Sequence, residues 1–186
     1  MSSPTPRFET ERLILRWLQP SDAADLLAVY GNVDAMRYWS SVPMQAVAEA
    51  EKMIADASGP YTEAGGMRLG IEHKASGKLI GTVSLFNIDL ECRRAEIGYI
   101  LSPAFWRQGL MSEVLNTLLI YAFETRGFNR LEADIDPRNV ASAKSLERLG
   151  FQREGLLRER WFVNGEVSDS ALYGLLRREW QAKNGR

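Results

Sequence analysis

The chain has 186 residues, 45% of them hydrophobic and 25% charged, so it is long enough for one domain that buries its own core. Its formal net charge of −1 gives no electrostatic reason to expect a nucleic acid or an anionic membrane as partner. The sequence has one cysteine, Cys92, which predicts a protein without internal disulfides. It has no membrane-spanning apolar run and no signal-peptide core, so we expect a cytoplasmic protein.

The first third of the chain predicts one strand followed by helices. Residues 11–18, ERLILRWL, alternate well enough for a strand. A Pro-Ser-Asp sequence then begins a helix over AADLLAVYG, and residues 32–39 and 44–57 predict further helical segments. Tyr38 and Trp39 could form the wall of a ligand pocket or belong to the core.

Residues 67–89 predict an antiparallel hairpin, because two apolar stretches, MRLGIEHK and KLIGTVSLFNID, flank a short turn that contains glycine. The Ser-Gly-Lys at this turn lacks the preceding glycine of a Walker loop. The only histidine, His73, lies at the polar end of the first stretch. With no second histidine and no cysteine cluster nearby, we interpret it as a surface residue and expect no metal site.

The centre of the chain, Arg94 to Gly127, predicts a strand that leads into a long helix. Side chains alternate over 96–101, and from Met111 the apolar positions follow one helix face until Gly127 ends it. Gly109 lies at the joint between the two. Free backbone N–H groups and the positive end of the helix dipole favour a phosphate there, although a glycine at such a joint can serve the turn geometry alone.

The next strand, LEADID, carries apolar side chains on one face and the carboxylates Glu132, Asp134 and Asp136 on the other. These carboxylates could attract a cationic acceptor or form an ordinary solvated edge. Asn139 begins a second helix, which ends at Gly150.

The tail predicts a closing hairpin. Its strands, FQREGLLRERWFV and EVSDSALYGLL, flank an Asn-Gly turn, and a short terminal helix or tail follows. With no repeat, linker or low-complexity segment, one mixed α/β domain over residues 1–186 is expected.

Two motifs in combination resemble the GNAT acyl-CoA N-acyltransferases: the Glu-Ile-Gly-Tyr strand at 96–99 and DPRNVASAKSLERLGF at 136–151. With the opening FETERLILRWLQPSDAADL, the chain is most similar to the RimJ and RimL branch of ribosomal-protein N-terminal acetyltransferases. The resemblance implies a GNAT fold: a mixed, mostly antiparallel sheet splayed between strands 4 and 5, with helices on both faces. Strand 4 would be the central strand, LEADID strand 5, and acetyl-CoA would lie in the split.

The resemblance also implies which residues hold acetyl-CoA. Backbone N–H groups would hold the pyrophosphate, and strand backbone would pair with the pantetheine. The implied residues are Arg107, Gln108, Gly109, Leu110, Met111 and Ser112 for the pyrophosphate, and Ile100, Leu101 and Asn139 for the pantetheine. Asn139 is also a helix N-cap by its sequence context. Trp106 and Met111 depart from the family's phosphate-loop pattern, and Met111 is expected to narrow the approach to the phosphate.

For catalysis, the resemblance implies Glu96 as general base, directly or through water, and Ser142 as the acid that protonates the leaving thiolate. A carboxylate in an apolar strand beside a cleft should have a raised pKa, which suits a base. Alternatively, Glu96 faces solvent or pairs with Arg93 or Arg94.

The resemblance leaves the acceptor open. An α-amine has a pKa of about 8 and a lysine side chain a pKa of about 10.4. Deprotonating a protein N-terminus therefore costs roughly 3 kcal/mol less than deprotonating a lysine. We therefore expect transfer to a primary amine, a protein N-terminal α-amine being one candidate. A polyamine or antibiotic acetyltransferase and a non-catalytic acyl-CoA sensor are the alternatives, and a homodimer is one possible assembly.

Overall fold

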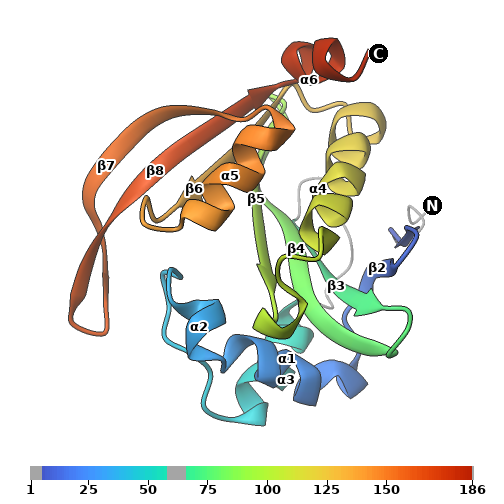
Figure 1. The fold of residues 1–186 in the computed structure, drawn as a ribbon, viewed down its shortest axis with the longest axis vertical. Coiled ribbons are helices and arrows are strands. Elements are labelled where there is room, and N and C mark those ends of the chain that lie inside the picture. The colour runs from blue at the N-terminus through green and yellow to red at the C-terminus, as the bar shows by residue number, and fades with distance from the viewer. Residues whose placement is uncertain (1–5, 58–65, 186) are drawn as a thin grey trace.

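The structure, a computed structural model, describes residues 6–57 and 66–185 and contains one eight-stranded sheet with helices around it (Figure 1). The strands are β1 (Phe8–Glu9), β2 (Leu13–Trp17), β3 (Met67–His73), β4 (Lys78–Asp89), β5 (Arg94–Leu101), β6 (Arg130–Ile135), β7 (Gln152–Val163) and β8 (Glu166–Leu176). The helices are α1 (Ala23–Tyr30), α2 (Val33–Met36), α3 (Val47–Ala57), α4 (Leu110–Ile120), α5 (Val140–Leu149) and α6 (Arg177–Asn184).

The strand order is β1-β2-β3-β4-β5-β6-β8-β7, and every pair is antiparallel except β5–β6. The expected strands 4 and 5 are thus β5 and β6, because the two-residue β1 adds one strand to the count. The parallel β5–β6 pairing covers only Arg94–Glu96 against Arg130–Glu132, whereas β5 continues to Leu101. Beyond Glu96 the sheet is therefore splayed, as expected for a GNAT fold.

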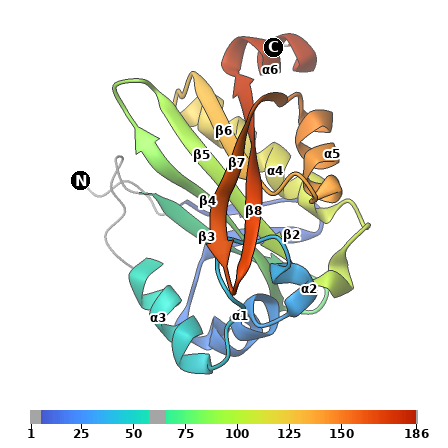
Figure 2. The same ribbon diagram turned by 90° about the vertical axis from the view of Figure 1, so that its left-hand side faces the viewer.

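Helices cover both faces of the sheet (Figures 1 and 2). On one face, α4 buries side chains such as Leu115 and Leu118 in a core that includes Leu69 and Ile97. On the other face, α1 and α3 form a second, smaller core, which Ile100 joins from β5. Because side chains alternate along a strand, Glu96 and Ile100 project to the α1–α3 face, and Ile97 to the α4 face.

The predicted elements are present, with shifted ends. The helix expected at 44–57 begins only at Val47, because the carboxylate of Glu49 accepts the N–H groups of Gln45 and Ala46 at 2.8 and 2.9 Å. The one expected at 32–39 is reduced to α2, which Asn32 caps.

The long helix predicted at 111–127 also differs from the expectation. It is regular only to Ile120, and a π-helical segment, Tyr121–Thr125, completes it before Gly127.

The closing hairpin β7–β8 extends away from the body of the molecule (Figure 1). Its turn is Asn164-Gly165, both at positive φ, as predicted from the Asn-Gly sequence. β7 is the edge strand, and Leu156 and Phe162 on it are exposed. The hairpin brings Arg160 and Trp161 to the cleft described below.

Candidate active site

A cleft of about 820 Å³ lies where the sheet is splayed. It is bordered by side chains from the strands, from the segment after α2, and from the start of α5. Its aromatic lining consists of Trp17, Tyr38, Trp39, Phe86, Tyr99 and Trp161. Its polar lining includes Arg68, Ser84, Asn87, Glu96, Asp134, Asn139, Ser142 and Arg160.

Tyr38 and Trp39 therefore line a pocket. The sequence had left open whether they form a pocket wall or belong to the core. Trp39 also packs on the second core, with its ring centroid 5.6 Å from that of Tyr30. Both interpretations hold for Trp39.

The backbone of β5 is open toward the split. Ser102 N–H donates to Ile80 O of β4 at 2.8 Å. By alternation, Ile100 also directs its backbone groups to β4, whereas Tyr99 and Leu101 direct theirs toward the split. The carbonyl of Leu101 accepts a bond from Trp106 Nε1 at 2.7 Å. The backbone groups open toward the split are therefore those of Tyr99 and the N–H of Leu101, whereas the residues expected to pair with the pantetheine were Ile100 and Leu101.

Glu96 lies at the last β5–β6 pair, partly buried, and accepts a hydrogen bond from Asn87 Nδ2 at 2.8 Å. Burial raises the pKa of Glu96, the bond from Asn87 opposes the rise, and the nearby carboxylates of Asp134 and Glu132 add to it. The raised pKa agrees with the expectation from sequence.

The predicted alternative for Glu96, pairing with Arg93 or Arg94, is not observed. Arg93 donates to Gly127 O at 2.6 and 3.0 Å. Arg94 pairs with Glu132 at 3.1 Å and with Asp89 at 3.5 Å.

Ser142 is buried in the first turn of α5, and its Oγ lies 2.6 Å from the hydroxyl of Tyr99. Asn139 caps this helix, its Oδ1 accepting from Ser142 N–H at 3.1 Å. Burial raises the pKa of Tyr99 to about 12, so its hydroxyl stays protonated at neutral pH. Tyr99 was expected only as a strand residue, and no local signal connects it to Ser142.

The loop before α4 has the geometry of an anion site. Arg107 and Gly109 are both left-handed, at φ 60 and 76. Within the described part of the chain, the N–H groups of Leu110, Met111 and Ser112 have no acceptor, as at any uncapped helix start. Successive N–H groups of this kind form a concavity that suits a phosphate.

Arg12 of the segment before β2 braces this loop. Its guanidinium donates to Gln108 O at 2.9 Å and to Glu113 Oε2 at 2.9 Å, and its backbone N–H donates to Glu113 Oε1. Burial alone would raise the pKa of Glu113, but hydrogen bonds from Thr10 and Arg12 outweigh it and lower the pKa. No local pattern in the sequence predicts this contact between distant segments.

The two atypical loop residues make intramolecular contacts. The indole of Trp106 donates to Leu101 O, and Met111 packs against the main core. Gln108 Nε2 donates to Ala104 O at 3.1 Å. These contacts hold the loop against the end of β5.

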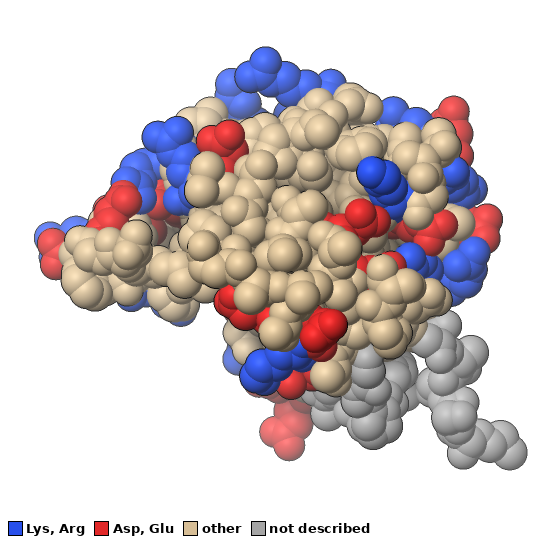
Figure 3. Space-filling view, turned by 90° about the horizontal axis from the view of Figure 1, so that it is seen from below, with Lys and Arg blue, Asp and Glu red and all other residues tan. Residues whose placement is uncertain are grey.

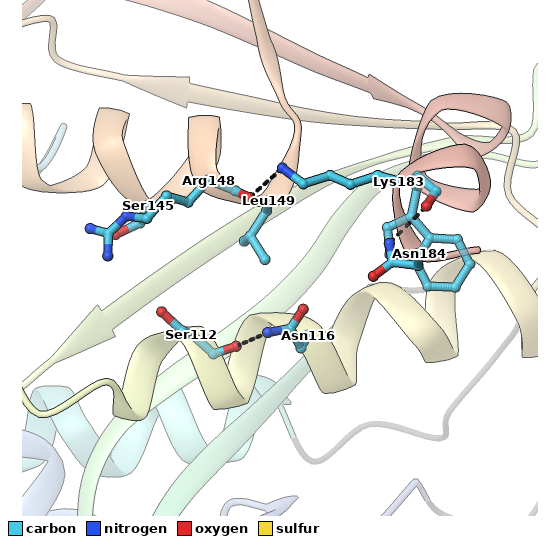
Figure 4. A pocket seen from close by; sticks show the side chains of 8 residues that line it. Ser112, Asn116, Ser145, Arg148, Leu149, Lys183 and Asn184 are labelled. Atoms are coloured by element: carbon cyan, nitrogen blue, oxygen red, sulfur yellow. Dashed lines mark hydrogen bonds between the residues drawn. The ribbon is translucent and has the colours of Figure 1, made fainter. Parts of the chain in front are cut away.

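A smaller hollow of about 180 Å³ lies between α4, α5 and α6 and adjoins Ser112 (Figure 4). Arg148 and Lys183 bring two cationic side chains to it, and Lys183 Nζ donates to Arg148 O at 2.5 Å. These residues were not among those predicted to hold acetyl-CoA.

The carboxylates of LEADID have cationic neighbours. Glu132 pairs with Arg94 and Arg130. Asp134 and Asp136 have neighbours of their own: Arg160 Nε lies 3.4 Å from Asp134 Oδ2, and Arg138 Nη2 lies 2.6 Å from Asp136 Oδ2. Seen from the α1–α3 end, charges of both signs surround a largely uncharged centre (Figure 3).

Within residues 6–57 and 66–185, no helix has both the length and the apolar character required to cross a membrane. His73 lies near the surface, with Nδ1 3.0 Å from Ser76 Oγ. Among the residues that the structure describes, no group of three His, Cys, Asp or Glu side chains is arranged to hold a metal.

A sheet splayed between two parallel strands, with an uncapped helix start beside the split and a partly buried carboxylate within it, is the architecture of an acyl-CoA-dependent transferase. Residues 12–152 match the family model described as an acetyltransferase (GNAT) domain, and the chain belongs to the GNAT acetyltransferases. It is an acetyl-CoA-dependent N-acetyltransferase.

The relatives agree with this assignment. The chain is 37% identical over 172 residues to YoaA of Bacillus subtilis, an uncharacterised N-acetyltransferase, covering 92% of this chain and 97% of the relative. It is 33% identical over 177 residues to YdaF of the same organism, provisionally named a ribosomal N-acetyltransferase, covering 93% and 96%.

A crystal structure of spermidine N-acetyltransferase from Vibrio cholerae, in complex with CoA and spermine, superimposes with a TM-score of 0.80 at 26% identity. The match covers 92% of this chain and 99% of that one.

Proposed function

We propose that this enzyme transfers the acetyl group of acetyl-CoA by direct attack of a primary amine, with Glu96 as general base and Ser142 as general acid. One observation carries the proposal: Glu96 and the Ser142–Tyr99 hydroxyl pair line the same cleft, with Glu96 and Tyr99 supplied by β5 and Ser142 by α5. A carboxylate with a raised pKa and a buried hydroxyl are the two proton-handling groups that the reaction needs.

Acetyl-CoA supplies the acetyl thioester, and the residues at the split fit it. The N–H groups from Arg107 to Ser112 would hold the pyrophosphate at the start of α4. The open backbone of Tyr99 and the N–H of Leu101 would pair with the pantetheine amides, as an added strand does. Since Asn139 Oδ1 already caps α5, its Nδ2 is the group left for the pantetheine.

The proton transfers follow from this placement. As the amine nitrogen bonds to the acetyl carbon, Glu96 takes a proton from it, directly or through a water. As the carbon–sulfur bond breaks, Ser142 Oγ donates its proton to the sulfur, and the hydroxyl of Tyr99 lies within reach to restore it. Glu96 then releases the proton of the amine to solvent, and Tyr99 regains a proton from solvent. A thiol has a pKa of about 8.5, so this acid matters less than the base.

For the acceptor, we propose a protein N-terminal α-amine. Its low pKa suits a carboxylate base, and the relative YdaF supports the same class. A small amine such as a polyamine is the second candidate, favoured by the spermidine acetyltransferase of Vibrio cholerae. An arginine beside each of Asp134 and Asp136 weakens the attraction for a polycation that this candidate requires. We also propose a single cytoplasmic domain.

The test is acetyl-CoA consumption over peptides with free N-termini, polyamines and aminoglycosides. Glu96→Gln should lower kcat/KM for the best acceptor by about 10²- to 10⁴-fold, and Glu91→Gln in an exposed turn should leave it unchanged. Wild-type turnover by Glu96→Gln from about pH 6 to 9 would show that Glu96 is not the base. Acetyl-CoA binding without turnover of any amine would favour the sensor alternative.

A further inference from the structure

The two arginines that line the cleft differ in their partners. Arg160 lies beside Asp134 and also over the ring of Trp161, 5.5 Å from its centroid. Arg68, which is partly buried, donates only from Nε, to Ser84 Oγ at 3.4 Å. Within the described ranges 6–57 and 66–185, its Nη1 and Nη2 groups have no acceptor and it forms no ion pair.

Arg68 and Glu96 project from the same face of the sheet. Arg68 pairs with Ser84 across β3 and β4, and Ser84 pairs with Gly98 across β4 and β5. Glu96 lies two residues before Gly98 on β5. Because side chains alternate along a strand, the side chain of Glu96 is on the same face of the sheet as Ser84 and Arg68. Two strand spacings and two residue rises separate the Cα atoms of Arg68 and Glu96 by about 12 Å.

Gly98 lies on this face between the two side chains, and the ring of Phe86 packs over it. A Cβ at Gly98 would lie 3.1 Å from Cε1 of Phe86, which leaves no slack for a larger residue. Arg68 and Glu96 thus line the same cleft from one face of the sheet, with Ser84 and the Phe86 ring between them.

A guanidinium whose two terminal nitrogens lack acceptors is complementary to a carboxylate, which accepts two parallel hydrogen bonds from it. The surroundings strengthen such a contact, because aromatic side chains border the cleft and lower the local polarity. The same charge repels a polyamine.

We propose that Arg68 binds a carboxylate of the acceptor, so that the substrate is an amine with a carboxylate close to it. The carboxylate belongs either to a free amino acid or to an Asp or Glu side chain near a peptide N-terminus. This inference rests on the proposed function, since the amine is placed by Glu96.

Two matched acceptor pairs test the inference: alanine against alaninamide, and a Ser-Asp peptide against its Ser-Asn counterpart. Wild-type enzyme should prefer the carboxylate member of one pair. That pair shows whether the carboxylate belongs to a free amino acid or to a side chain near a peptide N-terminus. Arg68→Gln should lower kcat/KM for this member about 10- to 100-fold and leave the neutral member nearly unchanged. Arg68→Lys should restore part of the preference, and Arg178→Gln on exposed α6 should alter neither.

Equal wild-type rates for the two members of each pair would overturn the inference. An Arg68→Gln variant that slows both members of a pair alike would also overturn it, because such a loss indicates a structural role for Arg68. Calorimetric titration of the same acceptors into CoA-saturated protein separates it from the proposed function. If wild-type protein binds the carboxylate acceptor more tightly and Arg68→Gln abolishes this preference, the inference is supported even when no acetyl group is transferred. The missing turnover would then contradict only the proposed chemistry. No binding or turnover of either carboxylate acceptor overturns it.

Discussion

Asn87 and Glu96 show how one neighbour affects the pKa of a partly buried carboxylate. Asn87 has a φ of 48, a left-handed conformation that asparagine adopts more readily than most residues. This conformation at the irregular end of β4 is accompanied by the bond from its amide to Glu96. That bond opposes the rise in the pKa of Glu96 that burial causes.

Asn87→Gly should therefore raise the pKa of Glu96 further, because glycine keeps the backbone conformation and removes the donor. The acidic limb of the kcat/KM profile should move to higher pH, since the base must be deprotonated to act. Asn164→Gly, at φ 50 in the exposed hairpin turn, is the matched control and should leave the profile in place. An unmoved limb in Asn87→Gly would show that this bond does not set the pKa.

The Ser142–Tyr99 pair predicts a coupled loss. Ser142→Ala should reduce kcat less than Glu96→Gln does, because the thiolate is a good leaving group. Tyr99→Phe keeps the ring and removes the hydroxyl 2.6 Å from Ser142 Oγ. If the two hydroxyls act together, the double variant should lose no more than the worse single one, whereas additive losses in kcat would separate their roles.

Among the elements, the segment before β2 is connected to α4 and to the loop that precedes α4. Arg12 holds both Gln108 and Glu113, so the loop and the first turn of α4 are fixed to the N-terminal part of the sheet. A loop that binds through backbone N–H groups depends on such bracing, since its own side chains contribute little to the contact.

Arg12→Gln should raise the Kd for acetyl-CoA about tenfold, because two charge-assisted bonds to the loop and to α4 are weakened. Isothermal titration measures this effect. Arg7→Gln is the control, because Arg7 is also exposed and pairs only with Glu9 among the described residues. Unchanged affinity in Arg12→Gln would mean that the loop keeps its conformation without the brace.

At the scale of the whole molecule, the two cores lie on opposite faces of one continuous sheet and share strands β4 and β5. We therefore expect the chain to unfold as one cooperative unit. Acetyl-CoA binds between β5 and β6 in our proposal, and a ligand held only by the native state stabilises it.

At a hundredfold excess over Kd, acetyl-CoA should stabilise the fold by about 2.7 kcal/mol and raise Tm by about 5 to 11 °C for a domain of this size. Scanning calorimetry with and without the ligand measures the shift, with adenosine as a control that lacks the pyrophosphate and pantetheine. Two separate transitions, only one of them shifted, would contradict a single domain.

The sequence determined what depends on neighbours along the chain. Strand alternation, helix periodicity, the Asn-Gly hairpin turn and the cap at Asn139 were all predictable, because each is set within a few residues. Glu96 and Ser142 were named through a family motif, and their catalytic roles remain predictions.

Only the tertiary structure decided which side chains meet. Tyr99 and Ser142 are 43 residues apart, and Arg12 and Glu113 are 101 apart. Contacts at such separations depend on the register between strands and on where the sheet splays, neither of which a local pattern encodes. The absence of an ion pair at Arg68 among the described residues likewise emerges only when β3, β4 and β5 lie side by side.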